Sequence, residues 1–111
     1  MTKCVAGKRY EADGRLSLYL SAIGHANYAE NGKDIVCTAV SCLCISCANT
    51  LIAAGVPAEC FRMKEGSFHL SAILAENQQY AEGAFDTAVM GLSMIAEQYP
   101  DYVFFASGVS H

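Results

Sequence analysis

The chain has 111 residues, 53% of them hydrophobic and only 16% charged, with a formal net charge of −4. A chain of this length can bury one core but not two, so we expect a single domain over residues 1–111. It contains no run of Lys and Arg, which argues against direct nucleic-acid contact, since affinity for phosphates comes mainly from clustered basic side chains. The charge-poor composition also predicts that some apolar surface is covered in an oligomer.

The N-terminal segment does not have the composition of a secretory signal. Residues 1–7 contain lysine and lack an apolar stretch. We therefore expect the six cysteines to lie in a reducing cytoplasm rather than in a disulfide framework. The uncharged stretch between Asp34 and Glu59 approaches the length of a membrane span, but its Ser, Thr and Asn residues and the lack of basic or aromatic flanks favour a buried helix. We expect no membrane contact.

Two antiparallel strands are predicted at the start of the chain. Residues 2–11 and 15–23 flank an Asp-Gly pair, a strong hairpin pattern, and the second segment alternates leucine with polar or small residues. Residues 24–33 are mostly small and polar and include two glycines. We interpret them as a mobile loop without the apolar anchors needed to pack it down.

A long helix is predicted next. Asp34 is a preferred N-cap residue, because its carboxylate accepts a backbone N–H two or three residues on, and Gly55 with Pro57 forms a stop. The helix is apolar on every side. A small sheet can cover only one side of it, so a second helix or a second subunit must cover the other.

A second hairpin and a second helix follow. Residues 58–64 and 67–74 surround a Glu-Gly turn, Asn77 can cap the helix, Pro100 ends it, and residues 102–106 form a last strand. The helix carries an apolar stripe made of Ala81, Phe85, Ala88, Leu92, Ile95 and Tyr99. The order ββαββαβ predicts an α+β fold of two layers, with two helices on an antiparallel or mixed sheet.

His25 and Cys37 are the candidate catalytic pair. With Asp34 as N-cap, Cys37 is the third residue of the helix, where free N–H groups and the positive end of the helix dipole favour a thiolate. The His25 imidazole can take the thiol proton and return it to a leaving group. The N–H groups at the helix start can also hold an oxyanion. The structural alternative is that both side chains only fill space, as a single His and Cys often do.

Two neighbouring residues leave alternatives open. Asp34 is most simply a cap, and it can instead orient His25, although its charge would oppose a thiolate. Ser41 lies one turn beyond Cys37 on the same helix face. Its hydroxyl can bond the sulfur or a substrate, or it can bond the carbonyl four residues earlier in the helix.

The other cysteines are not expected to form a metal site or a disulfide. Helix geometry points Cys42 and Cys44 to nearly opposite sides, and Cys44 only partly shares a face with Cys47, so these sulfurs cannot meet. We predict five small core residues: Cys42, Cys44 and Cys47 in the helix, and Cys4 and Cys60 in strands. His69 is expected at a surface or cross-strand position, and the terminal His111 is expected to be disordered. We expect no metal and no cofactor.

The segment from Gly24 to Ser41 carries a specific motif. It consists of Gly-His-Ala, a short loop, and then GKDIVCTAVSCL. This resembles the signature of the ribosomal-processing cysteine protease family, Prp. The matching positions are Gly24, His25, Ala26, Gly32, Asp34, Ile35, Val36, Cys37, Ala39, Val40 and Ser41. The Asp-Gly hairpin before the motif and the sequence GLSMIAEQYPDYV near the C-terminus extend the resemblance over the whole chain.

The resemblance implies an activity and a partner. Prp proteases are small α+β homodimers of Firmicutes and related bacteria, and they remove an N-terminal extension from a large-subunit ribosomal protein, cutting after aromatic residues. The resemblance implies His25 and Cys37 as catalytic residues and residues 27–31 as a segment that moves to admit the peptide. The candidates for supporting or substrate-binding roles are Gly24, Gly32, Asp34 and Ser41. The extra thiols Cys42, Cys44 and Cys47 depart from the family, which more usually has Ala or aliphatic residues there.

We therefore predict a cytoplasmic, homodimeric cysteine endopeptidase that acts on the N-terminal segment of a large-subunit ribosomal protein. One alternative is a non-catalytic ribosome-assembly factor that binds a basic ribosomal protein segment through its acidic surface, and this function requires neither His25 nor Cys37. Another is a thiol redox sensor, which requires cysteines but not His25.

Overall fold

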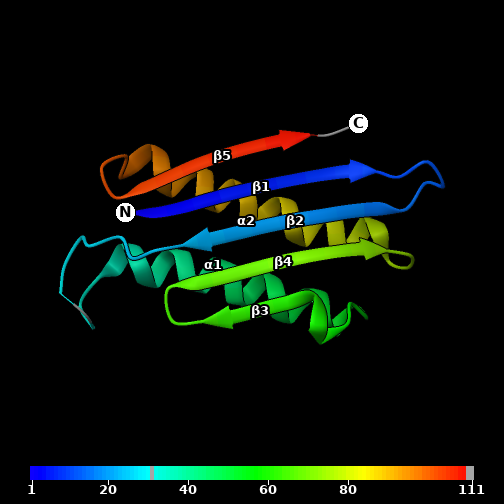
Figure 1. Ribbon diagram of the computed structural model, residues 1–111, viewed down its shortest axis with the longest axis horizontal. Coiled ribbons are helices and arrows are strands. Elements are labelled where there is room, and N and C mark those ends of the chain that lie inside the picture. Colours follow the sequence, from blue (N-terminus) through cyan, green and yellow to red (C-terminus); the bar gives the residue numbers. More distant parts are fainter. Residues whose placement is uncertain (31, 110–111) are drawn as a thin grey trace.

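The strands and helices follow one another in the predicted order. The computed structural model describes residues 1–30 and 32–109 (Figure 1). The elements are β1 (Thr2–Tyr10), β2 (Leu16–Ile23), α1 (Ile35–Ala53), the 3-10 helix η1 (Ala58–Cys60), β3 (Phe61–Lys64), β4 (Ser67–Leu74), α2 (Gln78–Gln98) and β5 (Val103–Val109). The α+β class, the order ββαββαβ and the long apolar first helix are confirmed.

All five strands belong to one mixed sheet of order β3-β4-β2-β1-β5. The two hairpins and the β2–β4 pair are antiparallel, whereas β5 pairs with β1 in parallel. Figure 1 looks onto one face of this sheet and places both helices behind it. The sheet therefore has a covered face, which packs on the helices, and an open face, on which the described residues place no helix.

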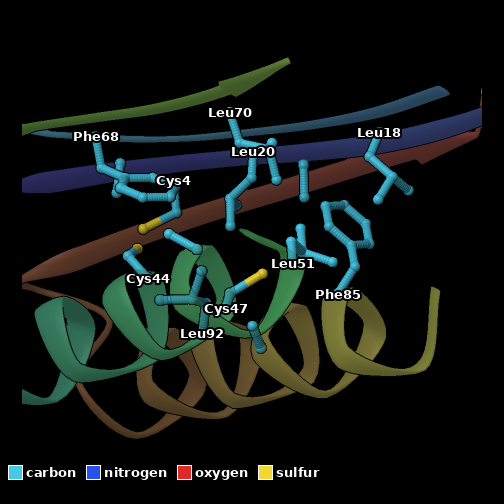
Figure 2. Packing of buried hydrophobic residues seen from close by; sticks show 14 of the residues in the cluster. Cys4, Leu18, Leu20, Cys44, Cys47, Leu51, Phe68, Leu70, Phe85 and Leu92 are labelled. Carbon is cyan, nitrogen blue, oxygen red and sulfur yellow. The ribbon is translucent and has the colours of Figure 1, made fainter. Parts of the chain in front are cut away.

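The core lies between the covered face and the two helices (Figure 2). The leucines that alternate along β2 are almost wholly buried, as period-two spacing predicts for a strand covered on one side. On α1 the buried residues form a stripe: Val36, Val40, Cys44, Cys47, Ala48 and Leu51. Length and composition alone would let α1 cross a bilayer, but this stripe packs within the protein, as in a core helix.

The helix α2 supplies the second cover that α1 requires. A Cβ atom on Gly91 would lie 2.8 Å from the Leu43 side chain, so the glycine allows the two helices to approach closely. The cover is incomplete, because Ile45 and Ile52 on α1 remain 46% and 38% exposed.

Several local predictions were wrong. Asn77 does not cap α2 with its side chain, which instead donates to the Ala54 carbonyl (2.9 Å) at the end of α1. Its backbone has φ 53°, so the residue makes a left-handed turn between β4 and α2. Cys42 is exposed, since it faces away from the buried stripe, and Cys60 lies in η1 and not in a strand.

The remaining local predictions concern the last strand and two histidines. β5 extends to Val109, beyond the predicted end at residue 106, because pairing with β1 continues as far as Lys8. His69 occupies a cross-strand position on β4, opposite Ser21 and Arg62. The terminal His111 lies outside the described residues.

Candidate active site

Cys37 lies in the first turn of α1, where the sequence predicted it. Asp34 is the N-cap residue, and its Oδ1 accepts hydrogen bonds from the backbone N–H groups of Val36 (3.0 Å) and Cys37 (2.9 Å). Capping of this kind fixes the helix start and therefore the direction of the cysteine side chain. The predicted capping role of Asp34 is confirmed.

The second carboxylate oxygen of Asp34 holds the loop that precedes the helix. It accepts from the backbone N–H groups of Tyr28 (2.9 Å) and Ala29 (3.4 Å). Burial would by itself raise the pKa of the Asp34 carboxyl, but the four backbone donors outweigh burial and hold its pKa below the ordinary value. Among the described residues, none of the Asp34 bonds goes to His25, so the structure gives no support to Asp34 as the orienting group.

A backbone donor from the loop is directed at the Cys37 sulfur. The N–H of Ala26 donates to Cys37 Sγ at 3.3 Å, and Ala26 itself is only 2% exposed. By contrast, the N–H groups of Val36 and Cys37 are occupied by the Asp34 carboxylate. Of the helix-start N–H groups predicted to hold an oxyanion, those of Val36 and Cys37 are therefore already bonded, and the Ala26 N–H is the donor beside the sulfur.

His25 is the second residue after β2 and lies against the turn between β3 and β4. The N–H of Gly24 donates to the Gly66 carbonyl (2.9 Å), which ties the end of β2 to this turn. A Cβ atom on Gly66 would lie 2.9 Å from His25 Nε2, and one on Gly24 would lie 2.5 Å from the Met1 carbonyl oxygen. Both glycines also have positive φ, so the backbone around the histidine depends on them.

His25 and Cys37 line the same two hollows. The helix-side cleft, about 300 Å³, has walls from Val40, Ser41, Cys44, Ile45, Met63 and Phe68. The loop-side cleft, about 420 Å³, is lined by Asn27, Ala29, Gly32, Asp34 and Thr38. Glu65 borders both clefts. An extended chain can therefore pass across the cysteine and histidine with one side in a mainly apolar cleft and the other in a more polar one.

The loop is anchored more firmly than its composition suggested. The Tyr28 ring makes edge-to-face contacts with Tyr99 (5.5 Å between centroids) and Tyr102 (5.1 Å), at the end of α2 and before β5. The interpretation of a loop without apolar anchors was wrong, because a single aromatic residue supplies one. Gly32 has φ +86°, and a Cβ atom there would meet nothing within 4 Å. Position 31 lies outside the described residues.

Ser41 is exposed and borders the helix-side cleft. In this part of α1, a side-chain bond to the carbonyl four residues earlier is made by Thr38, whose hydroxyl donates to the Asp34 carbonyl (3.0 Å). No such bond from Ser41 to a described residue occurs. The Ser41 hydroxyl therefore lies at the cleft, where a bound chain would meet it.

Three other thiols, those of Cys4, Cys44 and Cys47, are too deeply buried to act as nucleophiles. Burial raises the pKa of Cys4 and of Cys47 to about 11, and burial with the nearby Cys4 and Cys47 raises that of Cys44 to about 12. All six cysteines are free, and no group of three or more metal-ligating side chains occurs in the part of the chain that the structure describes. The prediction that Cys4, Cys44 and Cys47 are core residues is confirmed.

Comparison with known proteins identifies the family. The sequence profile described as cysteine protease Prp matches residues 5–104. The chain belongs to this family. Membership confirms the resemblance stated from the motif and makes the protein a cysteine protease, a hydrolase. Among curated protein sequences, none matches the chain.

Solved structures share the fold. An essential ribosomal processing protease Prp from S. aureus, in complex with a covalently linked product peptide, has a TM-score of 0.73 at 21% identity over 95% of this chain and 99% of that chain. SMU.848 from Streptococcus mutans has a TM-score of 0.70 at 25% identity over 99% and 96%. The S. aureus Prp in complex with a substrate peptide has 0.67 at 20% over 95% and 99%.

Sequence reasoning found the two candidate catalytic side chains, which the structure brings to the same clefts, and the Asp34 cap, but it missed three contacts. Gly66 was predicted as a turn residue, and no pattern linked it to His25, which is remote in sequence. The Ala26 N–H was missed because a backbone donor leaves no mark in the sequence. Tyr28 could have been found, since it is the one aromatic residue between His25 and Asp34.

Proposed function

We propose that the protein removes the N-terminal extension of a large-subunit ribosomal protein, with Cys37 as nucleophile and His25 as acid and base. The observation that carries this proposal is the arrangement around the sulfur. Cys37 and His25 border both clefts, and the Ala26 N–H donates to the sulfur. Nucleophile, proton carrier and a neutral donor thus surround the place where a peptide carbonyl would lie.

The same groups account for each step of peptide cleavage. His25 takes the proton of the Cys37 thiol, Cys37 Sγ attacks the carbonyl carbon, and the oxygen that becomes negative forms beside the sulfur, within reach of the Ala26 N–H. His25 gives its proton to the departing amine, which breaks the C–N bond and leaves a thioester. Water, deprotonated by His25, then hydrolyses the thioester and frees Cys37. No cofactor is required at any step.

The helix-side cleft supports an apolar side chain before the cut. Its walls include Val40, Ile45, Met63 and Phe68, which suit an aromatic ring of the extension. Two S. aureus structures of similar fold belong to a ribosomal processing protease with a product and a substrate peptide. These complexes support an extended peptide as the ligand of this protein too.

We further propose a cytoplasmic homodimer. Both helices carry exposed apolar side chains, with Ile45 and Ile52 on α1 and Met90 and Met94, each 61% exposed, on α2. A surface of this kind is more often covered by a partner than left in water. Sedimentation at micromolar concentration tests the dimer, and a clean monomer of 11.9 kDa would disprove it.

Cleavage of a peptide that spans the extension junction tests the activity. Cys37→Ala is expected to abolish cleavage, whereas Cys42→Ala, which changes an exposed thiol on the same helix outside both clefts, should cleave normally. His25→Ala and His69→Ala form a second matched pair, because His69 lies on β4 away from both clefts. Cleavage by Cys37→Ala at the wild-type rate would refute Cys37 as the nucleophile, whereas binding of the peptide without cleavage by the wild-type protein would leave binding alone, as an assembly factor requires.

A further inference from the structure

Basic side chains that are far apart in the sequence lie on the same open face of the sheet. Lys3 pairs with Ile23 in β2, Ile23 with Ser67 in β4, and Ser67 with Lys64 in β3. Paired residues share a face, and their sequence neighbours in β1, β2 and β4 are buried against the helices. The open face therefore carries four of the seven basic residues: Lys3, Arg9, Arg62 and Lys64.

Acidic side chains are almost absent from this face. None of the five strands contains Asp or Glu. Of the eleven acidic residues, only Glu11, directly after β1, reaches a basic residue of the open face in the described structure, with Arg9 Nη2 at 3.2 Å. On the covered face, by contrast, Lys8 is neutralised by Glu82 (2.7 Å) and Asp86 (2.9 Å) of α2. A protein of net charge −4 thus has one basic face.

Aromatic rings stand among these basic residues. Phe104 is 48% exposed and lies opposite Lys3, and Tyr19 is 42% exposed and lies opposite Gly7. Gly7 is also paired with Gly108, so neither of the next two strands places a side chain beside the Tyr19 ring. This leaves a shallow hollow of about 600 Å³, bordered by Arg9, Ser17 and Ser71. The open space beside the Tyr19 ring leaves room for a nucleic-acid base to stack on it.

We propose that the open face binds single-stranded RNA, with phosphates on Lys3 and Arg62 and a base on Tyr19. Sheets that bind single strands combine exposed aromatic rings with basic side chains in this way. A second copy is a poor occupant, because two open faces would oppose basic side chains with only Glu11 to compensate. An acidic peptide would satisfy the charges but would leave the hollow beside Tyr19 without a ring to fill it.

This face could not be recognised in the sequence. We expected no nucleic-acid contact because Lys and Arg form no run, but the basic residues of this face are divided between β1 and β3 and alternate with other residues. The inference is independent of the peptidase activity. If the proposed ribosomal substrate is right, such a face would hold the enzyme on RNA close to the protein it cuts.

Fluorescence anisotropy with a labelled oligouridylate of about 12 nucleotides tests the proposal at about 50 and 200 mM salt. Lys3→Glu/Arg62→Glu removes two phosphate contacts and should weaken binding at least about tenfold. Since each contact on a single strand contributes about 0.7 to the slope of log affinity against log salt, the slope should fall by about 1.4. The control Arg15→Glu/Lys33→Glu makes the same charge change away from the open face and should bind within about twofold of wild type.

A second pair of variants tests the aromatic part. Tyr19→Ala should weaken binding about tenfold, the loss expected for one stacked base. Tyr80→Ala removes a tyrosine that is 61% exposed on α2 and should change nothing. Circular dichroism and cleavage of a short peptide verify that each variant is folded. None of these residues borders the clefts beside Cys37.

Four results would overturn the proposal. The first is no saturable binding of the oligouridylate to wild-type protein. The second is an equal loss for both charge-reversal variants, which would indicate nonspecific attraction. The third is full competition by oligoglutamate with no effect of Tyr19→Ala, which would indicate an acidic peptide. The fourth is a change in sedimentation of Lys3→Glu/Arg62→Glu, which would show that a second copy covers this face.

Discussion

The first turn of α1 and the middle of the same helix use cysteine in opposite ways. In the first turn, Cys37 is partly exposed between two clefts and receives the Ala26 N–H. Two turns later, Cys44 is 2% exposed, and burial with neighbouring thiols raises its pKa to about 12. The same functional group is thus accessible or buried according to its surroundings. Reactivity depends on access and nearby donors rather than on the residue type.

The largest expected effect is a difference in the rate of alkylation between Cys37 and the buried Cys44. At pH 8 a thiol of pKa about 12 is ionised in only about one molecule in ten thousand, and burial blocks access as well. Iodoacetamide should therefore label Cys37 and Cys42 in the folded protein and spare Cys4, Cys44 and Cys47 until urea unfolds it. Mass spectrometry after timed labelling gives the order. Labelling of Cys44 as fast as Cys37 would contradict the distinction between the two regions.

The second effect concerns the support of His25. Gly66→Val would place side-chain atoms against His25 Nε2, since even a Cβ atom would lie 2.9 Å away. A displacement of about 1 Å in a catalytic group costs about 100-fold in kcat/KM, and we expect at least this loss. Gly14→Val is the matched control, because Gly14 also has positive φ in a hairpin turn but a Cβ atom there meets nothing within 4 Å. If both variants lose activity equally, strain in the turn is responsible and not contact with His25.

Local structure could be predicted from the sequence, whereas contacts between distant segments could not. The Asp-Gly hairpin, the alternating leucines of β2 and the Asp34 cap act over a few residues, so they fixed most elements and placed Cys37 in the first helical turn. The contact between Gly66 and His25 joins segments that are distant in sequence, and the Ala26 N–H belongs to the backbone. Neither follows from local pattern. Cys42 was misplaced because a helix apolar on every side gives no sign of which side is covered.

The third effect is a pH-dependent loss of stability through Asp34. Its pKa in the folded protein is below the ordinary value of 3.8, so the ionised carboxylate stabilises the fold. This contribution is fully present above about pH 3.8 and is lost as the pH falls through the lower folded value. Asp34→Asn should therefore lower the free energy of unfolding by about 1 to 2 kcal/mol at pH 7. Urea unfolding at pH 7 and at pH 3 measures it, and the difference from wild type should shrink at the lower pH.

The smallest effect concerns the anchor of the loop. Tyr28→Ala removes two edge-to-face contacts, with Tyr99 and Tyr102, each worth about 0.5 to 1.5 kcal/mol in a packed pair. Tyr28 is 41% exposed, so we expect a loss near the lower end of that range for stability.

The Ala26 N–H lies two residues before this anchor, and looser packing there should lower kcat/KM by about threefold to tenfold with a smaller change in KM. Hydrogen exchange of the Tyr28 and Ala29 amides, which donate to Asp34, should become faster. Tyr80→Ala, which changes an exposed residue of α2, should leave stability, kcat/KM and hydrogen exchange unchanged. If Tyr28→Ala speeds exchange but cleaves normally, the anchor is only structural, and Asp34 alone is sufficient to hold the Ala26 N–H beside Cys37 Sγ.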